Sequence, residues 1–175
     1  MTLLLSLALA ETPPETTPVA GRLEFSFGSS LLIREQALAG QDFTRIVPVP
    51  SVLMLGEFLV TPRVSIASFL NVPTGTATEF QEDGSVIEHH ASAAVALGVG
   101  LAPGLLPISE RAWFKPQLAA FGGRAIRSTS GTTWFPLAAV KLNVVTEDGF
   151  TMYGGASFAF SRNTAALIYG VGHRF

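Results

Sequence analysis

The sequence of 175 residues contains no cysteine, which excludes both a disulfide scaffold and thiolate chemistry. Charge is also scarce, because Asp, Glu, Lys and Arg together make up 14% of the residues and the net charge is −2. There is no basic cluster, so nothing indicates nucleic-acid binding. After the N-terminal segment no run of 18 or more apolar residues occurs, so a membrane-spanning helix is not expected.

The chain is nevertheless apolar, with 48% hydrophobic residues and a mean hydropathy of +0.42. Transmembrane β-strands produce this combination, because each needs only about 9–11 residues and exposes every second side chain to lipid. The alternative is a soluble lipocalin-like or sandwich protein with a large apolar core. Periodicity alone does not separate these two interpretations.

The N-terminus resembles the end of a secretory signal peptide. Residues 1–10 are apolar and finish with the small-x-small pattern Ala8-Leu9-Ala10, which is typical of a cleavage site. The pattern departs from a signal peptide in having no Lys or Arg before the apolar run, and a short buried helix is the alternative. We therefore expect a signal peptide over 1–10, a flexible Pro-rich segment over 11–20 and a β-barrel domain over 21–175.

Eight segments show the alternation of apolar and polar residues that is typical of strands. In the first, Leu23, Phe25 and Phe27 alternate with Glu24 and Ser26. The eight segments span residues 21–33, 47–61, 63–72, 85–101, 112–126, 133–146, 150–161 and 165–175. Between the sixth and the seventh, Glu147–Gly149 predicts a hairpin turn with Gly149 at positive φ.

The connections between these segments differ in length between the two sides. Two of the four on one side are long, Arg34–Ile46 and Pro73–Gly84, although the last on that side, Arg162–Thr164, is short; two of the three on the other side, Thr61–Pro62 and Glu147–Gly149, are short. This matches longer external loops and short periplasmic turns. The connection Ala102–Arg111 is too long for the rule.

Two prolines, Pro116 and Pro136, lie inside predicted strands. Proline cannot donate to a strand ladder, and a closed barrel has no free edge. Each proline is therefore predicted to mark a β-bulge or a wrong strand boundary.

The last segment carries the sharpest motif. Leu167, Tyr169, Val171 and His173 share a face with the final residue, Phe175. Ending on Phe, with Gly170 five residues earlier, resembles the C-terminal signal by which bacterial outer-membrane barrels are recognised for assembly.

Together these features resemble the small eight-stranded outer-membrane barrels of the OmpA transmembrane domain, OmpX and OmpW type. The resemblance implies an all-β fold, a closed antiparallel up-and-down eight-stranded transmembrane β-barrel in the outer membrane of a Gram-negative bacterium. It implies outer-membrane lipid and the barrel-assembly machinery as partners, with Gly170 and Phe175 as the assembly signal, and no cofactor.

If the apolar faces contact lipid, the opposite faces collect polar residues in the lumen. An eight-stranded barrel is only wide enough for side chains to fill it, so buried charges there are expected to pair. The residues predicted to form this network are Glu24, Glu57, Arg63, Glu88, His90, Lys115, Gln117, Lys141, Asn143 and Arg174.

One constellation suggests chemistry. Glu88, His90 and Ser92 alternate on one predicted strand, and a Ser–His pair with a carboxylate is the set that hydrolases use. The His-x-Ser spacing resembles outer-membrane lipid A deacylases. Residues two apart on a strand are roughly 6–7 Å apart, so polar lumen residues are the favoured interpretation. Because His89 and His90 are adjacent and point to opposite faces, no metal site is expected.

The sequence therefore favours a non-enzymatic outer-membrane barrel with a plugged polar lumen, which acts through residues 34–46 and 73–84 or as envelope structure. The alternatives are a narrow porin-like pore or a conduit for small hydrophobic molecules, a lipid-modifying hydrolase, and a secreted lipocalin-like binder. The sequence indicates no particular external ligand.

Overall fold

The computed structural model describes residues 22–37, 44–80, 84–89, 92–126, 134–160 and 164–175, with side chains described for these except 32–37, 44–48, 77–80, 87 and 89. The predicted signal peptide and Pro-rich segment lie outside the described residues. The strands are β1 (Leu23–Ala37), β2 (Thr44–Leu59), β3 (Val64–Pro73), β4 (Ala77–Phe80), β5 (Val86–His89), β6 (Ala93–Leu101), β7 (Leu106–Ser109), β8 (Ala112–Ile126), β9 (Trp134–Thr146), β10 (Phe150–Ala159) and β11 (Thr164–Arg174).

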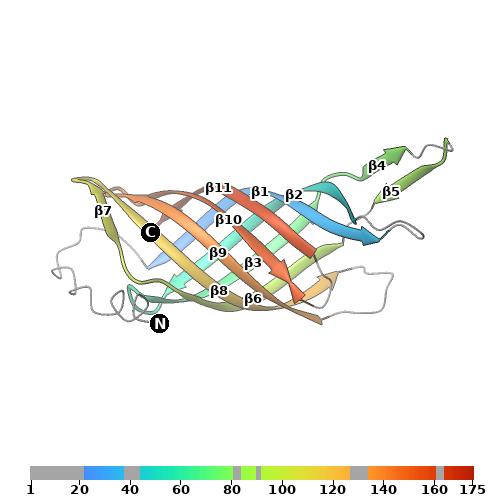
Figure 1. Cartoon of the computed structure of the whole chain (residues 1–175). Coiled ribbons are helices and arrows are strands. Elements are labelled where there is room, and N and C mark those ends of the chain that lie inside the picture. Colours follow the sequence, from blue (N-terminus) through green and yellow to red (C-terminus); the bar gives the residue numbers. More distant parts are fainter. Residues whose placement is uncertain (1–21, 38–43, 81–83, 90–91, 127–133, 161–163) are drawn as a thin grey trace, which may run out of the picture.

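Eight of these strands close into an antiparallel barrel (Figure 1). The hydrogen-bonded order is β6-β3-β2-β1-β11-β10-β9-β8, and pairing of β6 with β8 closes the cylinder. The first and last barrel strands are joined, because Phe175 donates its N–H to the Leu23 carbonyl at 2.7 Å and accepts the Leu23 N–H at 3.2 Å. The predicted all-β, closed eight-stranded barrel is confirmed.

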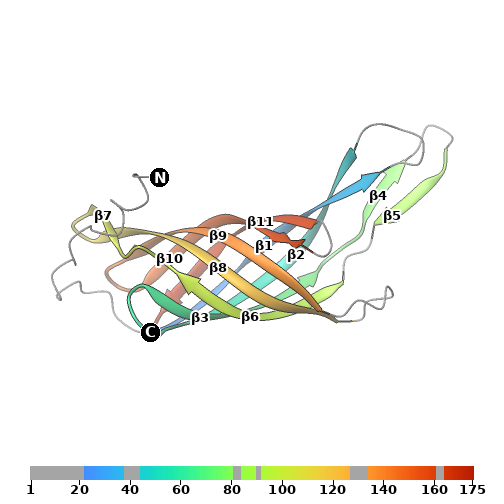
Figure 2. The ribbon, with the colours of Figure 1, turned by 60° about the horizontal axis from the view of Figure 1, so that its bottom comes forward.

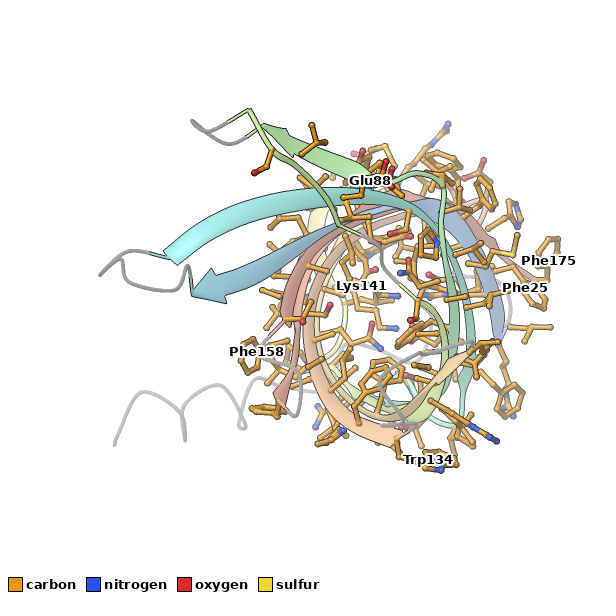
Figure 3. All side chains as sticks on the ribbon, turned by 90° about the vertical axis from the view of Figure 1, so that its right-hand side faces the viewer. Phe25, Glu88, Trp134, Lys141, Phe158 and Phe175 are labelled. Atoms are coloured by element: carbon orange, nitrogen blue, oxygen red, sulfur yellow. The ribbon has the colours of Figure 1, made fainter. Side chains whose placement is uncertain are left out.

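The alternation along each strand separates an apolar exterior from a mixed interior (Figure 3). On β1, Phe25 and Phe27 are exposed on the outside while Glu24 and Ser26 are buried inside. Large apolar side chains cover the outer surface on every barrel strand; they include Met54, Phe58, Ile66, Val95, Leu97, Leu118, Val140, Leu142, Met152, Phe158, Leu167, Tyr169 and Val171. A soluble monomer does not expose an apolar surface of this extent, so the inverted soluble barrel is excluded and the chain is a membrane-spanning barrel.

The two ends of the barrel differ in their connections and are named after them, the turn end and the extension end. The turn end carries the short connections at Thr61–Arg63 and Glu147–Gly149 together with Phe175. At the opposite end, the extension end, β1 and β2 continue as a paired ribbon to Ala37 and Thr44, and β4 and β5 form a separate two-stranded sheet. Figures 1 and 2 both show β4 and β5 projecting beyond the barrel.

These projections correct two sequence-based expectations. The segment 34–46 is not a plain loop, because strand pairing continues along most of it. The segment 85–101 is not one strand, because β5 pairs with β4 while β6 pairs with β3 and β8. The period-2 pattern is the same for both pieces, so alternation could not reveal that the chain leaves the barrel wall between them.

The two prolines lie in strands of continuous register, so the predicted bulges are wrong. Pro116 faces Leu142 and Pro136 faces Gly122 without any shift between β8 and β9. Each has a pairing partner on one side only: β6 pairs with β8 from Leu118 onward, and β10 pairs with β9 only up to Leu137. A proline is tolerated where one side of the strand has no partner.

The connection 102–111 is ordered as well as long. Its residues 106–109 form β7, which pairs with the start of β8 at the turn end. Predicted turn chemistry is confirmed at the next hairpin, where Gly149 has φ of 87°. There the Thr146 hydroxyl donates to Asp148 Oδ1, and this hydrogen bond lowers the pKa of the Asp148 carboxyl below its ordinary value.

Candidate functional site in the barrel lumen

Five ionisable side chains meet inside the turn-end half of the barrel, and all are buried: Glu24, Glu57, Lys115, Lys141 and Arg174. They come from β1, β2, β8, β9 and β11, so the group draws on strands all round the wall. Figure 3, which looks along the lumen, shows Lys141 inside the ring of strands, with Phe25, Phe158 and Phe175 outside it.

Glu57 is the centre of this ion network. Its Oε1 accepts hydrogen bonds from Lys115 Nζ at 2.8 Å and Gln117 Nε2 at 2.9 Å. Its Oε2 accepts one from Lys141 Nζ at 3.0 Å. Gln117 also donates to the Ser65 hydroxyl at 3.1 Å. A carboxylate with three such donors, two of them cationic, is stabilised in its charged form despite burial.

Lys141 explains how two carboxylates can lie side by side. Glu24 and Glu57 face each other directly in the β1–β2 register, and opposed like charges destabilise a strand pair. The Lys141 ammonium lies 3.0 Å from Glu57 Oε2 and 3.8 Å from Glu24 Oε1, so it bridges both. Arg174 Nη2 donates to Glu24 Oε2 at 2.9 Å from the other side.

The ion network is framed by further polar side chains. Asn143 is buried and donates to the Lys115 carbonyl at 2.8 Å. Some buried polar atoms nearby have no hydrogen-bond partner within the described part of the chain: Gln117 Oε1, Asn143 Oδ1, Thr151 Oγ1, Tyr153 OH and Arg174 Nε.

Not every residue predicted for the lumen lies there. Arg63 is exposed in the turn between β2 and β3, and Glu88 is exposed on β5, outside the barrel. Both predictions are wrong for the same reason, since each residue continues a period-2 pattern just past the point where its strand leaves the wall. His90 lies outside the described residues.

The predicted hydrolase set is not assembled on one strand. Glu88 belongs to the small β4–β5 sheet, whereas Ser92 is half-buried, comes just before β6 and lines the lumen. Because these elements belong to different sheets, the same-face spacing inferred from the sequence does not hold between Glu88 and Ser92.

The extension-end half of the lumen is apolar, which sequence reasoning missed. Leu53, Tyr153, Ala166 and Ile168 form one buried cluster. A second cluster contains Ala125, Phe135 and Ala159, with Leu137 packed against it. The signal was present in the sequence, because steps of two from Lys141 toward the start of β9 pass through Ala139, Leu137 and Phe135.

The residues of the predicted assembly signal lie on the last strand. Gly170 faces Gly28 across the β1–β11 pair, where an added Cβ would meet the Phe27 carbonyl and the Tyr153 hydroxyl. Phe175 is 66% exposed and points away from the barrel in Figure 3. Their recognition by assembly machinery stays a prediction.

Comparisons with known proteins find similarity in structure only. No protein-family model matches the sequence, and no curated protein is significantly similar to it. Among solved structures, the chain is similar to the attachment invasion locus protein Ail of Yersinia pestis. Ail in complex with the heparin analogue sucrose octasulfate has 13% identity and a TM-score of 0.44 over 89% of this chain and 99% of Ail.

Two further Ail structures are similar to this chain to about the same degree. Ail alone has 12% identity and a TM-score of 0.45 over 89% of this chain and 99% of Ail. Its backbone structure in a phospholipid bilayer nanodisc has 12% identity and a TM-score of 0.43, over 89% of this chain and all of Ail. This chain itself has an apolar exterior around a charged lumen and a closed antiparallel wall, which is the architecture of an outer-membrane β-barrel.

Proposed function

We propose that this chain is a non-enzymatic outer-membrane barrel, closed to ion flow, which acts through the strands that project at its extension end. The observation that carries the closed lumen is the ion network around Glu57. With short turns on the periplasmic side, the turn end faces the periplasm and the projecting strands face outward.

The network supports a closed lumen because its side chains cross the barrel. Lys115 and Lys141 reach Glu57 from β8 and β9, whereas Glu57 itself stands on β2. The exposed fractions of the Glu57 and Lys115 side chains are 3% each. Ions would have to displace these buried pairs to pass, and separating a buried pair is costly.

Planar-bilayer recording tests the closed lumen. The folded protein should produce no stepwise conductance at low voltage, whereas the double variant Glu57→Ser with Lys115→Ser, which shortens two crossing side chains, should produce measurable current. Reproducible channels from the unmodified protein would favour the pore alternative instead.

The projecting β4–β5 sheet is the element that we assign to external contacts. Residues 74–92 contain four acidic residues and no Lys or Arg, so this segment is suited to basic partners. The sulfated ligand of Ail is therefore not transferred to this chain.

Shortening the projection tests its role. Replacing residues 76–90 with a four-residue Gly-Ser turn should leave the barrel folded, because β4 and β5 form their own sheet. The shortened protein should still migrate differently before and after boiling, yet bind a cationic peptide such as polylysine less well than the full chain. Equal binding would contradict the assignment.

A further inference from the structure

The extension-end half of the lumen contains a cavity of about 140 Å³. Its walls are mainly apolar and come from several strands; they include Leu53, Phe69, Phe121, Phe135, Leu137 and Ile168. Phe69 and Phe121 meet edge to face, with ring centroids 5.4 Å apart. Aromatic pairs of this geometry are favourable, so the two rings form a fixed wall.

Several polar groups beside the cavity hydrogen-bond to one another. Ser30 donates to Asn71 Oδ1 at 2.8 Å and lies 3.1 Å from Ser51 Oγ. Toward the turn end the lining includes Glu57, Lys141 and Gln117, all of which are held in the ion network. The cavity is therefore an apolar space that ends at a charged floor.

The size and lining of the cavity indicate its ligand class. An apolar cavity of about 150 Å³ in another protein stays dry and binds benzene, and this cavity is of similar volume. The floor disfavours cations, because the buried network contains three cations, Lys115, Lys141 and Arg174, against the two carboxylates Glu24 and Glu57. An uncharged molecule avoids the desolvation penalty that an anion as well as a cation would meet in this mainly apolar space.

We propose that the lumen cavity binds one free, uncharged apolar molecule of about the size of a single aromatic ring, with Phe69, Phe121 and Ile168 contacting it. The ion network closes the site on the periplasmic side. This site is independent of the projecting strands, so its failure would leave the proposed external role unaffected.

Two neighbouring alanines provide a matched pair of variants. Ala119 lines the cavity, whereas the next residue on β8, Ala120, is exposed on the outer surface. Ala119→Leu adds three carbons inside the cavity, and Ala120→Leu adds the same three on the lipid side. If Ala119→Leu does not fold, Ala139→Leu offers the same change from β9, since Ala119 and Ala139 are register partners that both line the cavity.

The experiment is a toluene titration of the barrel in lipid nanodiscs, followed by NMR of labelled Ile and Leu methyl groups. The methyl groups of Ile168 and Leu137 should show saturable shifts, while those of the lipid-facing Leu97 should change only in proportion to the toluene dissolved in the bilayer. Ala119→Leu should weaken the saturable binding by about tenfold or more, because it overfills the site, and Ala120→Leu should leave it within about twofold.

Three outcomes would overturn the proposal. The first is the absence of saturable shifts at Ile168 and Leu137. The second is an equal response from the Ala119→Leu and Ala120→Leu proteins. The third is magnetisation transfer from lipid chains to the Ile168 methyl groups before toluene is added, which would mean that a lipid chain occupies the cavity.

Discussion

Glu57 is the residue on which the interior charge balance depends. It holds two lysine ammonium groups, at 2.8 and 3.0 Å, in a space from which solvent is nearly excluded. Charges of this kind contribute less net stability than their geometry suggests, because desolvation opposes their attraction. Removing one partner lowers the stability strongly, since the buried charges that remain then lose an opposite charge to pair with.

The first prediction follows from that asymmetry. Glu57→Ala should destabilise the folded barrel by about 3–5 kcal/mol, because it leaves Lys115 and Lys141 competing for the remaining carboxylate. Urea unfolding of the protein in lipid vesicles would measure the loss.

The chain offers a control for charge removal as such. Arg111 and Glu147 form an ion pair at 3.7 Å whose side chains are 85% and 51% exposed. Glu147→Ala should cost less than about 1 kcal/mol, since exposed pairs contribute little. Equal costs for Glu57→Ala and Glu147→Ala would contradict the role given to Glu57.

Two consecutive glycines on β10 give a second prediction. A Cβ at Gly155 would meet the Val140 carbonyl oxygen, whereas a Cβ at Gly154 would meet nothing within 4 Å. Gly155→Ala should therefore destabilise the barrel by about 1–3 kcal/mol through crowding, while Gly154→Ala should be neutral or stabilising. The same unfolding assay compares them, and an equal loss at the two positions would refute the close approach at Gly155.

For individual residues, the sequence predicted the members of the ion network better than it predicted where the strands leave the barrel wall. Glu24, Lys141 and Arg174 were placed correctly because they lie within β1, β9 and β11, which form part of the barrel wall. Arg63 and Glu88 were not, because alternation says nothing about where a strand leaves the barrel. The cavity was missed because alternation distinguishes the two faces but not the two halves of one face.

Among the elements, β1 and β11 form the junction that makes a sheet into a barrel. Their register runs from Glu24 opposite Arg174 to Arg34 opposite Thr164, so the first strand of the barrel pairs with the last. The sequence predicted this pairing only through the even number of strands. The two prolines show what the sequence could not predict. Pro116 and Pro136 are tolerated because each strand is paired on one side only at that point, and this depends on the tertiary structure and not on the local sequence.

The absence of native cysteine makes the junction testable. Phe27 and Val171 are register partners that both face outward, and directly opposed Cβ atoms lie within reach of a disulfide. Phe27→Cys with Val171→Cys should form a crosslink under mild oxidation, seen as faster migration of the denatured, unreduced chain.

A second pair controls for random collision. Phe27→Cys with Leu97→Cys puts two outward cysteines on β1 and β6, which are separated by β2 and β3. This pair should remain reduced under the same conditions. Crosslinking of both pairs at the same rate would argue against a closed wall with β11 beside β1.

The whole molecule is distinguished by an apolar outside and a charged inside. The sequence contains the alternation that produces this arrangement, but alternation alone fits an apolar core equally well, because it does not say which face is enclosed. The closed barrel decides between them by burying the face that carries Glu57 and Lys141 and exposing the face that carries Phe25 and Leu97. The membrane then has the role that a hydrophobic core has in a soluble protein.

Tryptophan quenching by brominated phospholipids tests this central claim most directly. The chain has two tryptophans: Trp134 is 66% exposed on the outer surface, and Trp113 is 7% exposed inside the barrel. Variants that keep one or the other, Trp113→Phe and Trp134→Phe, report on the two faces separately. Tyr169→Trp in a background without native tryptophan adds an outward position in the last strand.

We expect strong quenching of Trp134 and of the tryptophan at position 169 by bromine on the lipid chains, and weak quenching of Trp113 at every bromine depth. Strong quenching of Trp113, or equal quenching at the three positions, would contradict a barrel whose apolar face meets lipid and whose charged face is enclosed.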